Sequence, residues 1–267
     1  MATGVIYEFL FDHNVFDHIL ISHSIYPLSI AVSYVLFTKY LGPSLMRNKN
    51  GLQLKNFMIG FNLFLCLLNT YLSWTGTSQL VRFFYMNCRL KESPDYNIFK
   101  EALQLYGWHI YLVKFFELFD TVIFVLRKKF SQITFLHVFH HSIVFLICWI
   151  SMRIQVVGYY LLIIITVNSY VHVIMYFYYF LSAFGPRMQK YLWWKRHLTK
   201  LQMMQFVFAM VYLGQGFVTG CEHADKLEIT IFTLMILFFI LFLNFYLRTF
   251  LKNRSAQIRS KVIDKIK

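Results

Sequence analysis

Acidic residues are scarce in this chain of 267 residues, which has 12 Asp and Glu against 26 Lys and Arg. Charged residues of both signs make up 14 % of the sequence, whereas an ordinary soluble domain has about 25 %. The hydrophobic share is correspondingly high at 58 %, with 30 Phe and 18 Tyr residues. The shortage of charge together with the apolar excess excludes an ordinary soluble domain and indicates an integral membrane protein.

The sequence also lacks features that would divide or process the chain. It has no Gly-, Ser- or Pro-rich linker, no block of like charge and no repeat of fixed period, so we expect one membrane domain over 1–267. Its expected parts are a lumenal tail, a seven-helix core and a basic cytoplasmic tail, over 1–23, 24–248 and 249–267. The N-terminus has no basic stretch followed by an apolar core, so we expect no cleavable signal peptide.

Only four cysteines are present, and their spacing matches no metal or redox motif. Cys66 and Cys148 fall within apolar runs and are expected to fill the core. Cys88 and Cys221 fall in loops on the same expected side of the membrane. A disulfide between these two is therefore one alternative, and two free thiols are the other.

Seven stretches are long and apolar enough to cross a bilayer, which takes about 20 residues. The expected spans are 24–41, 57–74, 108–127, 133–150, 156–181, 201–219 and 229–248. Very short polar turns join the third span to the fourth and the fourth to the fifth, which makes these helices antiparallel neighbours. We therefore expect an all-α integral membrane protein with seven transmembrane helices.

Lys and Arg are distributed unequally between the two ends of these spans. If the acidic N-terminal tail lies outside the cytoplasm, 19 bases fall in cytoplasmic segments and six on the opposite side. This pattern is the positive-inside asymmetry expected for an odd number of spans and a cytoplasmic C-terminus. The net charge of +14 is therefore mainly a topology signal and does not indicate nucleic-acid binding. The same basic segments also suit an anionic ligand.

Ionisable residues inside the third expected span lie on one face of a helix. Lys114, Glu117 and Asp120 follow each other at three-residue spacing, so each is about one turn from the next. Lys114 and Glu117 can pair along the helix, whereas Asp120 needs a partner from another segment. Ionisable groups within a membrane usually face a protein interior or a water-filled cavity. They form either a structural ion network or, in the case of Lys114, a site that attracts an anion.

Three histidines lie on one face of the fourth expected span, within FLHVFHHSIVFLICW. A single buried histidine is usually a hydrogen-bonded core residue, but His137, His140 and His141 together predict a functional site. The fifth expected span adds Asn168 and His172, one turn apart. These polar stripes describe a helical bundle with lipid outside and a polar cavity inside.

Two kinds of enzyme chemistry compete for these histidines. An iron centre like that of the membrane desaturases needs several histidine boxes, and the sequence has no second HxxxH box, so we expect no metal. The other interpretation is that a neutral buried imidazole accepts a proton or attacks a carbonyl carbon. Cys148 is a weaker candidate nucleophile, because no base is adjacent to it. A histidine-lined transporter or proton-coupled channel is the non-enzymatic alternative.

Four motifs, in this order along the chain, resemble the family of very-long-chain fatty acid elongases. They are KFFELFDT from Lys114, HVFHH from His137, NSYVHVIMYFYY from Asn168 and TKLQMMQ from Thr199. The resemblance covers the membrane core, roughly 25–250. The residues around HVFHHS are most similar to the subgroup that acts on saturated and monounsaturated long acyl chains.

The resemblance implies a seven-helix fold in which six helices form a barrel around a closed-end substrate tunnel. It implies a 3-ketoacyl-CoA synthase, which condenses long-chain acyl-CoA with malonyl-CoA and releases CO2 and CoA, with no bound cofactor. The implied location is the endoplasmic reticulum membrane, with a lumenal N-terminus and a cytoplasmic C-terminus. The implied partners are a ketoacyl-CoA reductase, a dehydratase and an enoyl reductase, and a homo-oligomer is left open.

The expected site residues divide by role. His140 is the expected nucleophile towards the thioester, and the groups that assist decarboxylation or stabilise the enolate are His137, His141, His172 and Asn168. The expected substrate-binding residues, several of them cationic because CoA carries phosphates, are Lys114, Arg127, Lys129, Gln132, Tyr178, Lys195, Thr199 and Gln202. Glu117 and Asp120 are expected to form the ion network. The alternative role of Thr199 and Gln202 is to form hydrogen bonds between helices.

Overall fold

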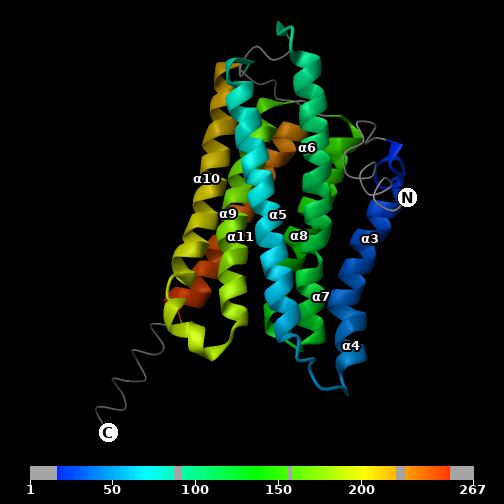
Figure 1. The fold of residues 1–267 in the computed structure, drawn as a ribbon, viewed down its shortest axis with the longest axis vertical. Coiled ribbons are helices and arrows are strands. Elements are labelled where there is room, and N and C mark those ends of the chain that lie inside the picture. The colour runs from blue at the N-terminus through cyan, green and yellow to red at the C-terminus, as the bar shows by residue number, and fades with distance from the viewer. Residues whose placement is uncertain (1–16, 87–91, 156–157, 221–225, 253–267) are drawn as a thin grey trace. The chain divides into compact units, whose positions relative to one another are not determined.

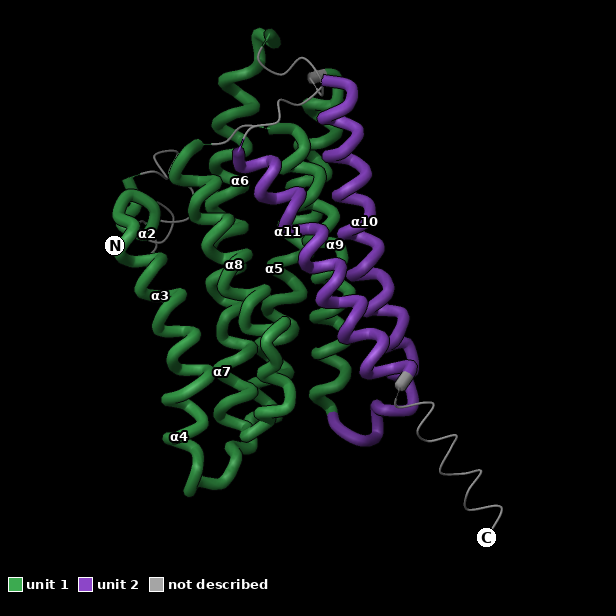
Figure 2. The backbone as a smooth tube through the Cα atoms, turned by 180° about the vertical axis from the view of Figure 1, so that it is seen from behind, with its two compact units in different colours: residues 1–184 green, residues 185–267 purple. Residues whose placement is uncertain are grey.

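The computed structural model describes residues 17–86, 92–155, 158–220 and 226–252, in which all regular secondary structure is helical (Figure 1). The expectation of an all-α protein is confirmed. The chain forms two compact units, 1–184 and 185–267 (Figure 2). The single membrane domain over 1–267 stays a prediction. The alternative of a disulfide between Cys88 and Cys221 is not tested, because both residues lie outside the described ranges.

The first unit contains most of the helices. They are α2 (Ile19–Ser22), α3 (Ile25–Leu36), α4 (Gly42–Met46), α5 (Lys55–Arg82), α6 (Tyr96–Glu117), α7 (Phe119–Leu126), α8 (Phe135–Arg153) and α9 (Tyr159–Ala183). A π-helical turn, η2 (Phe37–Leu41), joins α3 to α4, and 3-10 turns form η3 (Phe84–Met86) and η5 (Phe130–Gln132). The second unit consists of η6 (Pro186–Tyr191), α10 (Lys195–Thr219), α11 (Lys226–Tyr246) and the π-helical η7 (Leu247–Lys252).

Local sequence features set several of the helix ends. The side chain of Thr134 accepts a hydrogen bond of 3.2 Å from the backbone N–H of His137, which caps the N-terminus of α8. At the other end of the chain, Gly220 follows α10 in the left-handed conformation, with φ of 68°, a geometry that glycine adopts without the steric cost of a Cβ. The histidine-bearing helix therefore begins after a cap that lies three residues before the first histidine.

Five helices in the described part of the chain are long and apolar enough to cross a membrane: α5, α8, α9, α10, and α11 extended through Leu251. The other two expected spans are helical but interrupted. The 24–41 segment passes from α3 into the π-helical turn η2, and the 108–127 segment is divided at Leu118 between α6 and α7. The second of these also contains Lys114, Glu117 and Asp120, which lower its hydropathy. The count of seven spans and the barrel around a tunnel stay predictions.

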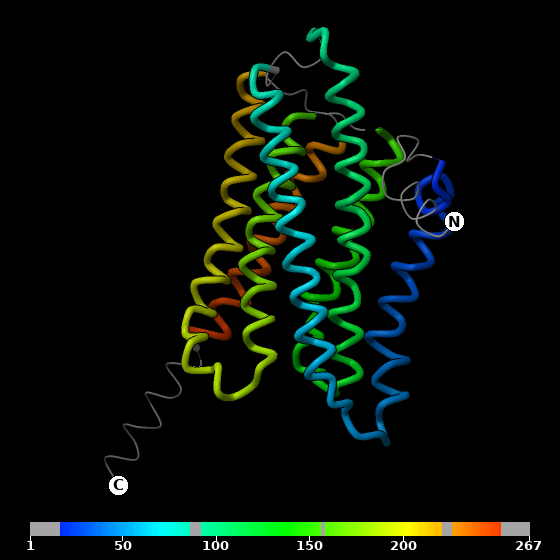
Figure 3. Tube along the Cα trace, viewed as in Figure 1, coloured from blue at the N-terminus to red at the C-terminus, as the bar shows by residue number. Residues whose placement is uncertain are grey.

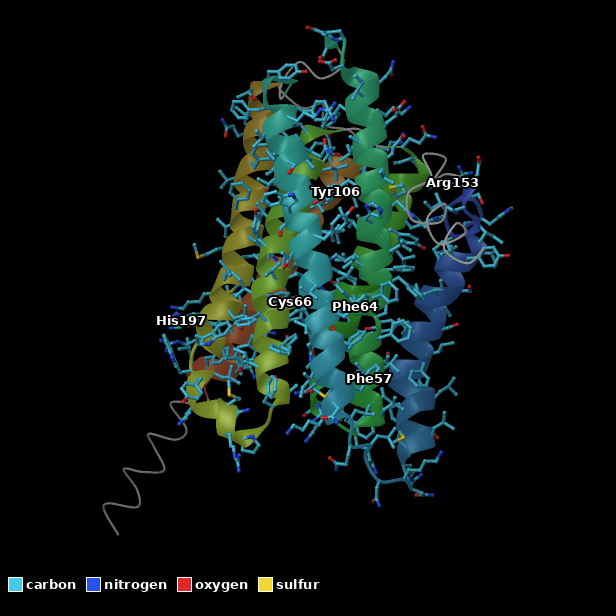
Figure 4. All side chains as sticks on the ribbon, in the orientation of Figure 1. Phe57, Phe64, Cys66, Tyr106, Arg153 and His197 are labelled. Atoms are coloured by element: carbon cyan, nitrogen blue, oxygen red, sulfur yellow. The ribbon has the colours of Figure 1, made fainter. Side chains whose placement is uncertain are left out.

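The most extensive helix pairing in the first unit joins α5 to α9 (Figure 3). Gly76 of α5 makes this close approach feasible, because a Cβ at that position would overlap Thr166 Oγ1 and come within 2.5 Å of the Tyr106 hydroxyl. That hydroxyl donates to the carbonyl of Leu72 at 3.0 Å and ties α6 to α5. Figure 4 labels Tyr106 on α6 beside α5, which carries the labelled Phe57, Phe64 and Cys66.

Helices α2 and α3 are fastened to α6 and α8 by aromatic groups. The indole of Trp149 donates to the carbonyl of Ile21 at 3.2 Å, and the Tyr111 hydroxyl donates to the carbonyl of Leu20 at 3.4 Å. Further along, the ammonium group of Lys39 donates to the carbonyl of Ile133, just before α8, at 3.0 Å. These contacts hold the N-terminal helices against the helix that carries the three histidines.

In the second unit, α10 packs against α11 through tilted and edge-on phenylalanine rings. The ring centroid of Phe206 lies 5.9 Å from that of Phe238 and 5.2 Å from that of Phe242. Phe217 and Phe232 make a similar contact at 5.7 Å nearer the other end of the pair. Aromatic packing therefore holds the last two helices together along their length.

Candidate active site

A buried ion network links α6 to α9 within the first unit. The ammonium group of Lys114 donates to both carboxylate oxygens of Glu117, at 3.0 and 3.2 Å, as the three-residue spacing predicts. It also donates to Asn168 Oδ1 at 3.1 Å. His172 Nδ1 lies 2.9 Å from Glu117 Oε1. Two helices therefore place one cation, one carboxylate, one amide and one imidazole in contact.

The network fixes which nitrogen of His172 carries the proton. A carboxylate only accepts hydrogen bonds, so the contact of 2.9 Å with Glu117 requires a proton on Nδ1 of His172. The contact between Lys114 and the same nitrogen is longer, at 3.4 Å. With the proton on Nδ1, the lone pair of a neutral imidazole is on Nε2, where it can act as a base. Glu117 thus orients His172 and sets its tautomer.

Asp120 obtains its partner from α9, as its lack of a partner on its own helix predicts. The Tyr176 hydroxyl donates to Asp120 Oδ2 at 2.7 Å, and both side chains are buried. A carboxyl group removed from water needs such a donor, because an unpaired buried polar group is costly. This bond is a second link between the acidic face of α6–α7 and α9.

The three histidines of α8 form one group. The ring centroids of His137 and His141 are 4.4 Å apart, and those of His140 and His141 are 5.6 Å apart. Lys114, Glu117 and His172 lie within electrostatic range of the His140 ring. The structure therefore brings the predicted catalytic side chains of α8 and α9 into one neighbourhood, together with the ion network.

Two hydroxyl groups, one from α7 and one from α3, are linked in series to His137. His137 Nε2 lies 2.9 Å from Thr121 Oγ1 on α7, and that oxygen lies 2.6 Å from the hydroxyl of Tyr34 on α3. Tyr34 and Thr121 are both buried. The sequence interpretation assigned no role to Tyr34, and the available signal was a tyrosine in an otherwise apolar helix. Thr121 was part of the KFFELFDT motif, but its partner could not be deduced from the spacing.

The expected substrate-binding residues of the first unit differ in burial, since some are buried and others are exposed. Tyr178 is buried on α9, and Lys114 lies within the ion network. Arg127 caps the end of α7, while Lys129 and Gln132 are exposed beside η5. All three are near the connection to α8, and their role in binding stays a prediction.

The remaining expected substrate-binding residues belong to the second unit. Lys195 is exposed at the first position of α10, Thr199 is buried one turn later, and Gln202 follows at the next turn. They share one helix with the spacing expected from the sequence. Their contribution to a site with the histidines stays a prediction.

Metal binding was the competing interpretation of the histidines. In the ranges that the structure describes, no group of three or more His, Cys, Asp or Glu side chains is arranged to hold a metal ion. The hydrogen-bonding contacts of His137 and His172 are instead with Thr121 and Glu117. These hydrogen bonds suit imidazoles that exchange protons or attack an electrophile.

These features define an all-helical membrane protein with a group of histidines and a buried Lys–Glu pair. Comparison with known proteins places it more narrowly. Residues 19–258 match the model of the ELO family, described as GNS1/SUR4. The chain belongs to this family, and the family resemblance predicted from the four motifs is confirmed.

Several curated relatives are similar over most of their length. Very long chain fatty acid elongase 7 of Rattus norvegicus is 38 % identical over 258 residues, covering 91 % of this chain and 87 % of the relative. Very long chain fatty acid elongase 1 of Homo sapiens is 40 % identical over 234 residues, covering 85 % and 81 %. Very long chain fatty acid elongase 4 of Homo sapiens is 38 % identical over 228 residues, covering 84 % and 70 %.

Proposed function

We propose that this protein is the condensing enzyme of fatty acid elongation, joining a long-chain acyl-CoA to malonyl-CoA to give 3-oxoacyl-CoA, CO2 and CoA. Its membership in the ELO family and the names of its relatives support an enzyme of fatty acid elongation. The observation that carries the proposal is the grouping of His137, His140 and His141 on α8 and the contact of buried His172 with the Lys114–Glu117 pair.

In the proposed first step, a ring nitrogen of His140 attacks the thioester carbonyl carbon of the acyl-CoA. A carbon–nitrogen bond forms, the carbon–sulfur bond breaks, and CoA leaves as a thiolate that takes up a proton. The acyl group is then held as an acyl-imidazole. A neutral imidazole is the nucleophilic form, and a dry interior favours it because burial disfavours the charged form.

In the proposed second step, malonyl-CoA loses CO2 and its enolate attacks the acyl carbon. A carbon–carbon bond forms, the bond to His140 breaks, and 3-oxoacyl-CoA is released. Negative charge develops on the enolate oxygen, and fixed donors in a water-poor site stabilise such charge best. Lys114, Asn168 and the remaining histidines are the candidates for this role. Direct condensation without an acyl-enzyme is the alternative order of events.

The cytoplasmic segments supply the proposed site for the CoA phosphates. Arg and Lys are the usual partners of phosphate, and the chain has no Asp or Glu between Asp120 and Glu222 to compete with the phosphates for them. Arg127, Lys129 and Lys195 are the proposed contacts at the mouth. Gln132, Tyr178, Thr199 and Gln202 are the proposed polar lining between the mouth and the histidines. No bound cofactor is required by the proposed reaction.

We place the enzyme in the endoplasmic reticulum membrane as a multi-pass protein with a lumenal N-terminus. The basic excess of the cytoplasmic segments supports this orientation. A 3-oxoacyl-CoA product must be reduced, dehydrated and reduced again before another cycle. The proposed partners are therefore a ketoacyl-CoA reductase, a dehydratase and an enoyl reductase in the same membrane.

The test is turnover by the purified protein in detergent with malonyl-CoA and a long-chain acyl-CoA. We expect release of CO2 and formation of 3-oxoacyl-CoA, detected by mass spectrometry, and an acyl adduct on a peptide containing His140. Both should disappear in His140→Ala. The matched control is His23→Ala, an exposed histidine away from the group, which should retain full activity.

The opposite results would overturn the proposal. Absence of turnover combined with pH-dependent ion flux in liposomes would identify the histidine-lined transporter, an alternative that the family membership does not favour. Iron present in stoichiometric amount in active protein would replace the metal-free chemistry. Turnover with sequential kinetics and no adduct would retain the enzyme but establish direct condensation.

A further inference from the structure

We propose that Thr121, on α7, is a positioning residue that fixes the proton of His137 on Nδ1, with the hydroxyl of Tyr34 on α3 as the donor to Thr121. This inference rests on the proposed function, because its consequence is a hydrogen-bond donor in the group of histidines. The three residues come from three different helices, and hydrogen bonds of 2.6 and 2.9 Å connect them. Only the tertiary structure brings them together.

The direction of this chain of hydrogen bonds follows from counting protons. Thr121 Oγ1 has one proton and two contacts, with Tyr34 and with His137 Nε2. Among the described residues, the Tyr34 hydroxyl forms its hydrogen bond with Thr121. If Tyr34 donates to Thr121, then Thr121 can donate to Nε2 of a neutral His137, and every proton has an acceptor.

The reverse direction leaves a proton without an acceptor. It would require Nε2–H of His137 to donate to Thr121 and Thr121 to donate to Tyr34. The phenol proton of Tyr34 would then be buried with no acceptor, since the side chain is 6 % exposed. Such a stranded donor costs about 1–3 kcal/mol. The structure therefore favours the direction from Tyr34 to His137.

The consequence is a defined role for His137. Its Nε2 lone pair is occupied by Thr121, so this nitrogen does not act as a base. Its proton lies on Nδ1, and the ring centroid of His141 is 4.4 Å from that of His137. In this tautomer His137 is a hydrogen-bond donor within the group of histidines, which suits stabilisation of developing negative charge or orientation of His141.

The position of α3 is fixed independently of this chain, which makes the relay rigid. Lys39 donates to the carbonyl of Ile133 at 3.0 Å, and Trp149 donates to the carbonyl of Ile21 at 3.2 Å. These two contacts join the N-terminal helices to α8 on either side of Tyr34 in sequence. Removal of the single hydroxyl of Tyr34 therefore leaves the helix docked.

The first experiment compares Thr121→Val with the wild type in the condensation assay. We expect kcat to fall about tenfold with unchanged KM, because the His137 proton is no longer held on Nδ1 while substrate contacts remain. Thr121→Ser, which keeps the hydroxyl, should retain most of the activity, and Tyr34→Phe should lower kcat less than about twofold, because Thr121 can still donate to Nε2. Tyr40→Phe is the matched control, because Tyr40 is 68 % exposed on the same segment.

The second experiment uses the geometry of amide side chains. Asn at position 137 places an N–H near the position of Nδ1, so His137→Asn should retain more activity than His137→Gln. The amide carries its proton whatever Thr121 does. Thr121→Val should therefore have less than a twofold effect in the His137→Asn background.

Several outcomes overturn the inference while leaving the enzyme intact. These are an unchanged kcat in Thr121→Val, a tenfold effect of Thr121→Val that persists in the His137→Asn background, or higher activity in His137→Gln than in His137→Asn. A lowered yield of folded protein with normal kcat per folded molecule would assign Thr121 a purely structural role. Lack of turnover in the wild type would instead refute the proposed function.

Discussion

Glu117→Gln should strongly destabilise the protein, because it leaves the buried ammonium group of Lys114 without its counterion. Glu117 is 1 % exposed and Lys114 is 7 % exposed, and the nearest nitrogen–oxygen distance is 3.0 Å. At this distance the attraction is about 5 kcal/mol with an effective dielectric constant near 20. Breaking a buried pair by removing one partner costs about 3–5 kcal/mol. Glutamine also makes a weaker acceptor for His172 Nδ1–H.

The measurement is the midpoint of thermal unfolding in detergent, followed by tryptophan fluorescence. A loss of this size should lower Tm by roughly 10 °C, since 1 kcal/mol corresponds to about 2–4 °C in a protein of comparable size. The control is Glu101→Gln on the same helix, where the carboxylate is exposed and the change should be within about 1 °C. Condensation activity should also fall, because His172 loses its fixed tautomer.

A double variant separates the stranded charge from other causes. In Lys114→Met/Glu117→Gln neither charge is buried, so most of the lost stability should return. Activity should not return, because His172 still lacks a carboxylate partner. The reasoning is refuted if Glu117→Gln melts at the temperature of the wild type, or if the double variant melts as low as the sum of the two single changes predicts.

Two further predictions concern helix packing and charge at the mouth. Gly76→Ala should lower stability by about 1–3 kcal/mol, measured as a fall in Tm, because the added methyl group overlaps Thr166; an unchanged Tm would show that α5 and α9 are not in such close contact. Arg127→Gln/Lys129→Gln should raise KM for malonyl-CoA several-fold at low salt and less at high salt, because exposed charges are screened. Lys100→Gln, on α6 away from this connection, is the control and should leave KM unchanged; equal effects at both positions would contradict a specific phosphate site.

The polar side chains within single helices were predictable from the sequence. The pairing of Lys114 with Glu117 follows from three-residue spacing, because the geometry of an α-helix is the same in any context. The need of Asp120 for a partner elsewhere also followed, since no cation lies one turn away. The identity of that partner, Tyr176, depended on how α9 is rotated towards α7. The motif letters placed Tyr176 in the family pattern without assigning it this contact.

Spans were predicted less well where polar groups interrupt them. The segments of α5, α8, α9, α10 and α11 have continuous hydropathy, and the structure forms long apolar helices there. The 24–41 and 108–127 segments were expected to be single spans, but a π-helical turn and a break at Leu118 divide them. The helix α5 continues to Arg82, beyond the expected end at residue 74, because backbone hydrogen bonding does not stop where the side chains become polar.

The sequence by itself determined the membrane class, the helices, the family and the face of each helix that carries polar groups. These properties depend on composition and on local periodicity, which act over a few residues. Only the tertiary structure decided that Tyr34 reaches His137 through Thr121, and that α5 pairs with α9 across Gly76. Such contacts depend on the rotation and relative height of helices far apart in the chain, and packing of the whole first unit sets both.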